Sequence, residues 1–550
     1  MKVYQRLARA FIAEGTTATF GMMGDGNMYW LYELHKLGVK VHEVRHEGAG
    51  LGMADGWART TNTPGVATAT CGPGTTQLAT AFVTAARAES PVVAFCGEYP
   101  TNDDEYSQRF DQSIFATACE AGFVRLATPE AADEVVRKAF FLARTQRRPI
   151  MLSAPMDIQQ QEWEDDDPYQ PSSTLIPQAL VHPDPAAIEQ VVAAIAESKL
   201  PVIVAGRGAR WANAGDAVLA LGDRIGALVT VSLLAKNWLA DRTEYHAGIS
   251  GTYASKTAMK LMQEADCVIG VGASLNRQTT EHGYLYPNAR YIQIDTRPQV
   301  LMSGVRGANL HVHADARVGL EAIERALAAR GHRNTGYRTA DVKRQLARHY
   351  EDPRVVPIDA GTVDPRAACL LLDELIPREI GVIAGNGMGG GIVNMMMPRA
   401  REIAQGGHAF GCIGQALPAA MGAVAAIGGK PLVLLDGDAG IMMHIGEFET
   451  AVRYGMPLLT IVLNNEALGA EYYKLEAKKM DVKYAQVGTP DIGAIGVAMG
   501  GRGRLVRTLD ELRAAVGEWL AKPGPMLIDM RISRTVVSIP YRRIHFGMDD

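Results

Sequence analysis

The stretch LDGDAGIMMHIGEFETAVRYGMPLLTIVLNN, residues 435–465, decides the fold that we expect for this chain. It contains the end of a hydrophobic strand that closes on Asp-Gly-Asp at 436–438, a helical segment, and a second hydrophobic strand that closes on Asn-Asn at 464–465. In an open parallel sheet the carboxyl ends of neighbouring strands face one crevice, where ligands bind. One helix and one returning strand account for the interval, so we expect Asp438 and Asn465 to meet at that crevice.

A carboxylate and an amide oxygen at one crevice form a hard-oxygen ligand set suited to Mg²⁺, which also keeps water and phosphate oxygens as ligands. Ala439 and Gly440 open the helical segment and are small enough for backbone N–H groups to approach an anion. The alternative is that the first motif is a plain turn and the second an unrelated loop. Both motifs at this spacing, each after a hydrophobic strand, favour a site for a metal ion and a phosphate.

The rest of the chain repeats short apolar strands that end in glycine and precede a helix, as in PVVAFCG at 91–97, PVIVAGRG at 201–208 and DCVIGVG at 266–272. This pattern is typical of parallel sheets covered by helices on both faces. We therefore expect an α/β protein with three doubly wound parallel-sheet domains. Two stretches are the expected linkers: an acidic, proline-rich one near 159–183 and a charged one near 330–362.

These linkers divide the 550 residues, too many for one hydrophobic core, into blocks of ordinary domain size. The expected domains are residues 1–165, 185–335 and 360–535, followed by a C-terminal tail at 536–550. We expect the basic, aromatic tail to pack on a neighbouring subunit or to cap the active site.

Composition excludes several classes of function. The net charge of -5 provides no basic excess for a nucleic acid, and six scattered cysteines show no zinc spacing. The N-terminal segment lacks the long apolar centre of a signal peptide, and the most apolar later stretch is too short to span a bilayer. We expect a cytoplasmic protein with no nucleic-acid partner and no membrane association.

The segment that decides the fold resembles the thiamine-diphosphate motif of the pyruvate decarboxylase, acetolactate synthase and benzoylformate decarboxylase superfamily. The resemblance implies pyrimidine-binding, central and diphosphate-binding domains, in that order. It also implies that Asp438, Asn465 and the backbone carbonyl of Ala467 bind Mg²⁺, and that the diphosphate lies against Gly437, Asp438, Ala439 and Gly440. Ala439 departs from the glycine of the family motif, a mild change that leaves metal binding intact.

The first block carries the glutamate that this resemblance requires. RHEGAGLGMADGWAR, residues 45–59, is similar to the RHEQ-A-ADGYAR segment of the family, and Glu47 falls on the position whose carboxyl protonates the aminopyrimidine ring. That role needs a buried carboxyl with a raised pKa. The alternative is an exposed glutamate at the start of a small-residue helix. TATCGPGTTQ, residues 68–77, resembles the SGPG loop that packs against the active site, and it includes Gly72.

Two further segments resemble parts that hold the cofactor. Residues 408–423 match G-x-(large apolar)-G-x-x-L-P-A-A, which implies that Ile413 is the wedge between the two rings and that the carbonyl of Gly411 accepts from the exocyclic amine. The alternative for Ile413 is an ordinary core residue. AGNGMGG at 384–390 stands where the family has a loop that touches the diphosphate; the residues concerned are Gly385, Asn386 and Gly387.

Acid–base candidates are less specific. Asp25, in a segment similar to FG-x-PGD-x-N, and Glu471, six residues after Asn465, match catalytic acids of the pyruvate decarboxylases. Asp25 is equally suited to a turn, and Glu471 to a solvated helix face. The paired histidines of those decarboxylases are missing from residues 98–118, where Gln112 resembles a glutamine of acetolactate synthases. His46 and His408 are the nearby histidine candidates.

These features favour an acetolactate-synthase-like enzyme that combines decarboxylation of a 2-oxo acid with addition to an aldehyde or ketone. The alternatives are a non-oxidative 2-oxo acid decarboxylase, a 2-hydroxyacyl-CoA lyase and, more remotely, a non-catalytic nucleotide-binding protein. The resemblance implies a homodimer or homotetramer with active sites at the subunit interface. FAD, bound in the central domain of some relatives, is not favoured because residues 185–335 contain no GxGxxG motif.

Overall fold

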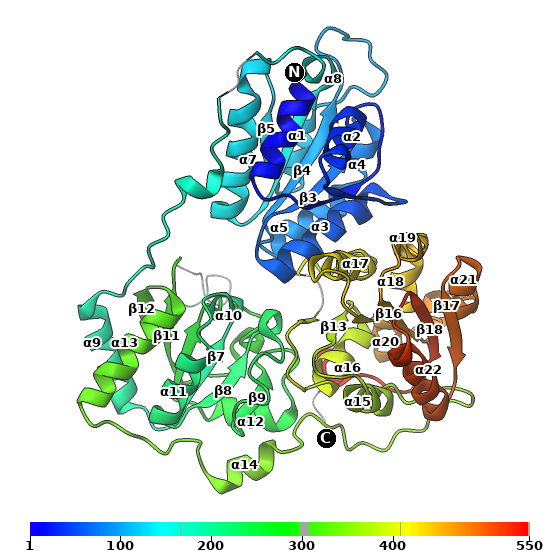
Figure 1. The fold of residues 1–550 in the computed structure, drawn as a ribbon. Helices are drawn as coiled ribbons and strands as arrows, with labels where there is room; N and C mark the ends of the chain where they lie inside the picture. The colour runs from blue at the N-terminus through cyan, green and yellow to red at the C-terminus, as the bar shows by residue number, and fades with distance from the viewer. Residues whose placement is uncertain (165–166, 298–306, 407–408, 548–550) are drawn as a thin grey trace.

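Three six-stranded sheets, all parallel, form the framework of the protein in a computed structural model that describes residues 1–164, 167–297, 307–406 and 409–547. Each sheet is doubly wound, and Figure 1 shows the three α/β units one after another along the chain. The predicted α/β class is therefore confirmed. No helix in these ranges is both long and apolar enough to cross a membrane.

The first sheet has the strand order β2-β1-β3-β4-β6-β5. One of its faces packs against α1, α2 and α7, and the other against α3 and α5. Its strands are β1 (Ala18–Gly21), β2 (Lys40–Glu43), β3 (Gly65–Ala69), β4 (Val92–Glu98), β5 (Gly122–Arg125) and β6 (Pro149–Pro155). Its helices are α1 (Val3–Ala13), α2 (Met28–Lys36), α3 (Glu47–Thr61), α4 (Pro73–Thr76), α5 (Ala79–Arg87), α6 (Gln112–Ala118), α7 (Ala132–Gln146) and α8 (Met156–Gln159).

The second sheet has the order β12-β11-β10-β7-β8-β9, with its own two-sided core. Its strands are β7 (Pro201–Ala205), β8 (Leu228–Val231), β9 (His246–Ile249), β10 (Cys267–Val271), β11 (Arg290–Asp295) and β12 (Leu310–His313). Its helices are α9 (Pro185–Glu197), α10 (Arg207–Trp211), α11 (Gly215–Ile225), α12 (Lys256–Gln263), α13 (Ala316–Ala329) and α14 (Ala340–Leu346), which packs on the same core although it lies in a predicted linker.

The third sheet has the order β14-β13-β15-β16-β18-β17. Its strands are β13 (Gly381–Ala384), β14 (Ala404–Gly406), β15 (Leu432–Gly437), β16 (Leu458–Asn464), β17 (Arg502–Val506) and β18 (Met526–Arg531). Its helices are α15 (Pro365–Leu375), α16 (Met388–Met396), α17 (Ala416–Ala426), α18 (Asp438–Met443), α19 (Glu447–Arg453), α20 (Gly469–Ala477), α21 (Ile492–Ala498), α22 (Leu509–Ala521) and α23 (Ile539–Phe546).

Two details of the third domain differ from expectation. The sequence predicts one helix between β15 and β16, but the structure has two, because the chain turns at 444–446 before α19 begins. The tail helix α23 packs on α16 and α20 of its own chain, and the Arg543 guanidinium donates to the carbonyl of Thr252 in the central domain. The tail therefore joins the third domain to the second within one chain.

The first and third domains share one hydrophobic core, which forms where α3 crosses α17 (Figure 1). The crossing is close because glycines stand at the contact: a Cβ on Gly56 would overlap the carbonyl of Ala419, and a Cβ on Gly422 would overlap the carbonyl of Met53. This contact places the start of α3 beside the loop that precedes α17.

Candidate functional site

The two motifs of the third domain converge as the sequence predicts. β15 and β16 are paired neighbours in parallel register, with Gly437 opposite Leu463, so Asp438 and Asn465 leave the same edge of the sheet. Both side chains are buried, and the carboxylate of Asp438 accepts a hydrogen bond from the backbone N–H of Glu466. This bond ties the end of β15 directly to the loop after β16.

The donor set at this edge fits a magnesium ion. Burial raises the pKa of Asp438 to about 6, against the opposing effect of backbone N–H donors, and its Oδ2 atom has no protein partner. A buried carboxylate oxygen without a donor is a position where a bound cation is expected. Within the described residues, the amide oxygen of Asn465 accepts one 3.2 Å bond, from the N–H of Ala467, which leaves a lone pair for a metal ion.

A cradle of glycines lies next to this donor set. Gly385 has no room for a side chain, because a Cβ there would overlap the Asp436 carboxylate, and a Cβ on Gly440 would press on the same group. Gly387 caps α16 with a φ of 91°, in the region that favours glycine. Partly accessible backbone at the starts of α16 and α18 suits the binding of a diphosphate.

Asp436, under this cradle, is a residue that the sequence analysis missed. It is fully buried, and burial followed by the nearby charge of Asp438 raises its pKa to about 7. One of its oxygens accepts from the N–H of Gly437 at 2.8 Å and the other has no partner. The sequence feature that could have identified Asp436 is its place as an acidic residue at the end of an otherwise apolar strand.

The predicted wedge loop adjoins the predicted diphosphate loop. The side-chain amide of Asn386 donates to the backbone carbonyl of Cys412 at 2.7 Å. Gly411 and Gly414 have φ values of 76° and 92°, so only glycine fits both positions without strain. Ile413, between them, is only partly buried, so part of its side chain is accessible.

Glu47 is the first residue of α3, and His46 caps the helix by accepting from the N–H of Gly48 at 3.0 Å. The Glu47 carboxyl is partly buried and points at the turn that contains Gly74, where an added Cβ would lie 3.2 Å from Oε1. Gly72, in the same turn, has a φ of 61° and lies against Gln108. The predicted glutamate and the GPG turn therefore lie next to each other.

The crossing of α3 and α17 brings together two halves of the predicted site, one from the first domain and one from the third. Thr84 of the first domain contacts the Cys412 sulfur at 3.1 Å, beside the wedge position, and the rings of His46 and His444 meet with centroids 5.2 Å apart. Burial, with a smaller effect of His46, lowers the pKa of His444 to about 4. In this single chain both halves come from the same molecule, and their exchange between subunits stays a prediction.

Asp25 occupies the exposed tip of a rigid turn at the end of the first sheet. Asn27 accepts from the N–H of Gly24 at 2.8 Å, and the N–H of Gly26 donates to Thr70 at 3.0 Å. Thr70 precedes the GPG turn, so Asp25 stands on the same side of the sheet as that turn. Asp25 is therefore a turn residue, and its catalytic role stays a prediction.

The other two acid–base candidates differ in their surroundings. Gln112 is buried at the start of α6; its amide donates to the carbonyl of Gly97 at 2.7 Å and its Oε1 atom has no partner. Glu471 is exposed on α20 and pairs with Lys474 at 3.2 Å, as on a solvated helix face. His408 lies outside the described residues.

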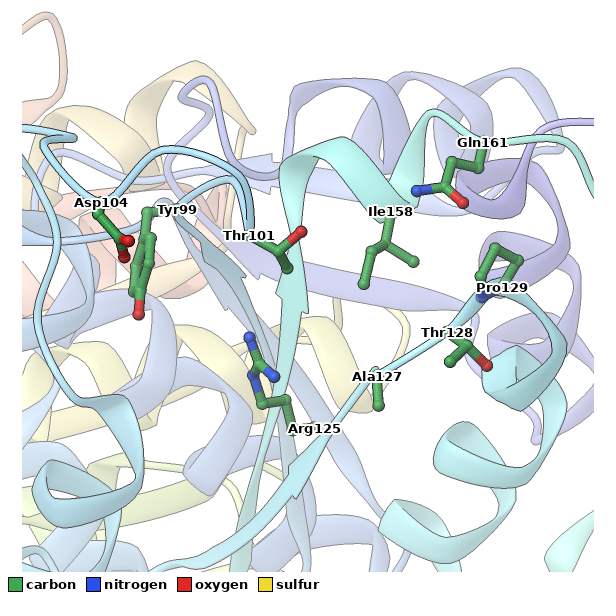
Figure 2. A pocket seen from close by; sticks show the side chains of 9 residues that line it. All are labelled: Tyr99, Thr101, Asp104, Arg125, Ala127, Thr128, Pro129, Ile158 and Gln161. Carbon is green, nitrogen blue, oxygen red and sulfur yellow. The ribbon is translucent and has the colours of Figure 1, made fainter.

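A surface cavity of about 540 Å³ lies elsewhere, at the carboxyl ends of β4, β5 and β6 (Figure 2). None of the predicted site residues lines it. Its cation, Arg125, is neutralised by Glu98, whose carboxylate accepts two bonds at 2.9 Å. This cavity is therefore a weaker candidate for the functional site than the region between α3 and α17.

Comparison with known proteins agrees with this arrangement. Residues 1–117 match the N-terminal TPP binding domain, residues 188–323 the central domain, and residues 389–530 the C-terminal TPP binding domain of thiamine pyrophosphate enzymes. The chain belongs to the thiamine pyrophosphate enzyme family. It is accordingly a thiamine-diphosphate-dependent enzyme, which confirms the predicted family and cofactor.

Several curated family members align with nearly the whole chain. The probable acetolactate synthase large subunit of Methanocaldococcus jannaschii is 28% identical, over 97% of this chain and 92% of its own. The acetolactate synthase isozyme 2 large subunit of Escherichia coli K12 is 26% identical, over 96% and 95%. The sulfoacetaldehyde acetyltransferase of Castellaniella defragrans is 27% identical, over 98% and 94%.

Proposed function

We propose that this protein is a Mg²⁺- and thiamine-diphosphate-dependent carboligase that decarboxylates a 2-oxo acid and joins the remaining acyl group to an aldehyde or ketone. The observation that carries the proposal is the convergence of Asp438 and Asn465 at one sheet edge, together with the contact between His46, next to Glu47, and His444 at the end of α18. The acetolactate synthases among the relatives support this reaction over others.

In this proposal the third domain holds the metal ion and the diphosphate. Asp438, Asn465 and the carbonyl of Ala467 bind Mg²⁺, and the backbone of Gly385, Asn386, Gly387, Gly437, Ala439 and Gly440 faces the diphosphate. When bound, thiamine diphosphate supplies a carbon nucleophile and an electron sink for cleavage next to a carbonyl. Ile413 would pack against the rings of the bound cofactor.

Glu47 supplies the acid–base function of the first domain. Its carboxyl would exchange a proton with the aminopyrimidine nitrogen of bound thiamine diphosphate, and the Gly411 carbonyl would accept from the exocyclic amine. The absence of a side chain at Gly74 leaves room for this carboxyl, and a bound cofactor would cover it. Desolvation of that kind is what brings a glutamate pKa toward the operating pH.

Asp25, from its rigid turn, and Gln112, with a free amide oxygen, are the groups that we assign to the substrate. Glu471 could join them only if α20 moved, because its carboxylate faces solvent and pairs with Lys474. The carboligase proposal therefore depends on Asp25 and Gln112 more than on Glu471.

A second candidate is acyl transfer with a sulfonated aldehyde as the donor, which the sulfoacetaldehyde acetyltransferase relative favours by covering 98% of this chain. The acyl-CoA lyase alternative has less support. Arg543, which a nucleotide could have attracted, is engaged with the Thr252 carbonyl and with Glu281.

We also propose that the working enzyme is at least a homodimer in which the α3–α17 contact joins two chains. The chain between the first and second domains is mostly exposed over residues 176–184, so the first domain can make the same contact with the third domain of its own chain or of another. If the first domains of two identical chains exchange places, the α3–α17 contact is kept and no additional interface is required.

A screen of 2-oxo acids for CO₂ release, with and without added aldehydes or ketones, tests the reaction. Carboligation predicts a product that requires both partners and disappears without Mg²⁺ or thiamine diphosphate. Release of a free aldehyde as the sole product would contradict the proposal. Turnover of sulfoacetaldehyde with phosphate would establish the second candidate instead.

A further inference from the structure

The edge strand β2 and the residues after it are docked on α19 of the third domain. The hydroxyl of Tyr454, just after α19, accepts from the N–H of Glu43 at 2.8 Å and donates to the carbonyl of Val41 at 3.2 Å. The Arg453 guanidinium donates to the carbonyl of Glu43 at 2.7 Å. Side chains of the third domain thus form hydrogen bonds with backbone N–H and C=O groups of the first domain. At the edge of a sheet these backbone groups are otherwise unpaired.

Glu447, the first residue of α19, makes the central contact of this seam. Its Oε1 atom accepts from the N–H of Arg45 at 2.9 Å, and the N–H of His46 also donates to the carboxylate. Its other oxygen accepts from the Thr450 hydroxyl at 2.8 Å. The side chain is 1% exposed, so water cannot replace these bonds.

The two peptide N–H groups that Glu447 holds are those immediately before Glu47. His46 is the cap of α3, so fixing its backbone fixes where the helix starts and in which direction the first side chain leaves. A neighbouring contact, the Arg45–Glu449 ion pair at 2.7 Å, lies in an exposed position and restrains a side chain only.

We propose that Glu447 is a positioning residue that sets the Glu47 carboxyl against the aminopyrimidine of the cofactor. This inference rests on the proposed role of Glu47. An acid–base group must lie within hydrogen-bond distance of the proton it moves, and a displacement of about 1 Å costs on the order of 100-fold in rate. Glu447 reaches Glu47 from the domain that holds the diphosphate, so it aligns the two ends of the cofactor site.

The test uses the full-length protein with Glu447→Ala, Glu447→Gln and Glu447→Asp, and Glu449→Ala as the matched control on the same helix. Hydrogen–deuterium exchange of the cofactor-free protein reports on the amides of residues 44–46. Exchange of the C2 proton of bound thiamine diphosphate, followed by NMR after acid quench, reports on the step that Glu47 serves. Cofactor affinity is measured separately by calorimetry.

For Glu447→Ala we expect the amides of residues 44–46 to lose at least about tenfold in protection. We expect C2 exchange to slow by about 10- to 100-fold, with a smaller change in affinity. Glu447→Gln keeps an acceptor oxygen and should retain more of the exchange rate than Glu447→Asp, whose carboxylate is drawn back by one methylene. If the alanine variant does not fold, the C2 exchange rates of Glu447→Gln and Glu447→Asp are compared with each other and test the positioning role.

The failures are distinguishable. If Glu47→Gln leaves C2 exchange at the wild-type rate, the proposed function is wrong, whatever Glu447 does. If Glu47→Gln abolishes exchange while every Glu447 variant behaves like Glu449→Ala in both assays, the positioning role is overturned and the proposed function stands.

Discussion

Gly56 of the first domain lies directly against the backbone carbonyl of Ala419 in the third, so that α3 and α17 touch backbone to backbone. The contact belongs to a single hydrophobic core that spans both domains. Since Glu47 begins α3 and Ile413 precedes α17, the spacing of these two helices sets the width of the cofactor site.

We expect Gly56→Ala to separate the two helices and to lower both stability and cofactor binding, by about 1–3 kcal/mol for an overpacked backbone contact. Thermal unfolding and calorimetric titration with thiamine diphosphate measure the two effects. Gly517→Ala is the control, because an added Cβ in α22 meets no neighbour there, and it should be neutral or slightly stabilising. Equal behaviour of the two variants would contradict the role of the crossing.

Removal of the Asp438 carboxylate should weaken thiamine diphosphate binding in the presence of Mg²⁺ by at least about tenfold, because a buried, unpartnered oxygen of the metal site is lost. Titration of Asp438→Ala at several Mg²⁺ concentrations measures this. Asp510→Ala, at an exposed position in α22, is the control with the same chemical change. Wild-type affinity in Asp438→Ala would place the metal ion elsewhere.

Mixing two inactive variants tests the exchange of halves between subunits. If Glu47 and Asp438 of one site come from different chains, co-expression of Glu47→Gln with Asp438→Asn yields dimers that contain one intact site. Random pairing then restores about a quarter of wild-type activity. Differently tagged subunits allow the mixed dimer to be isolated. A mixed dimer without activity would mean that each site is built within one chain.

Acid should destabilise the protein through two partly buried histidines at a small cavity between the second and third domains, His246 and His349. Burial lowers their pKa values to about 3 and about 4, from 6.5. The unfolded chain therefore binds these protons first, and stability falls as pH drops from about 6.5 to about 4 for His349 and to about 3 for His246. Each histidine should account for about 1–2 kcal/mol at pH 5.

Thermal unfolding of His246→Gln and His349→Gln between pH 5 and 8 checks this expectation. Each variant should show a shallower decline than the wild type on the acid side. His35→Gln is the control, because that side chain is exposed on α2 in the folded protein. An unchanged slope in both cavity variants would assign the acid sensitivity to other groups.

Much of the site could be predicted from sequence because its groups lie at fixed places in repeating units. Asp438 and Asn465 each follow an apolar strand, and parallel strands deliver their ends to one edge, so their convergence follows from periodicity alone. Glu47 was predictable only through its family motif, since nothing local separates it from an exposed glutamate at a helix start.

The sequence by itself determined the α/β class, the three parallel sheets and the residues that end their strands, because local hydrophobic periodicity encodes these features. Tertiary structure alone decided which distant groups meet. Glu447 contacts the backbone before Glu47, 400 residues away, and Glu471 faces solvent although its spacing matches a catalytic acid. Such contacts depend on how whole domains pack, which no short window of sequence records.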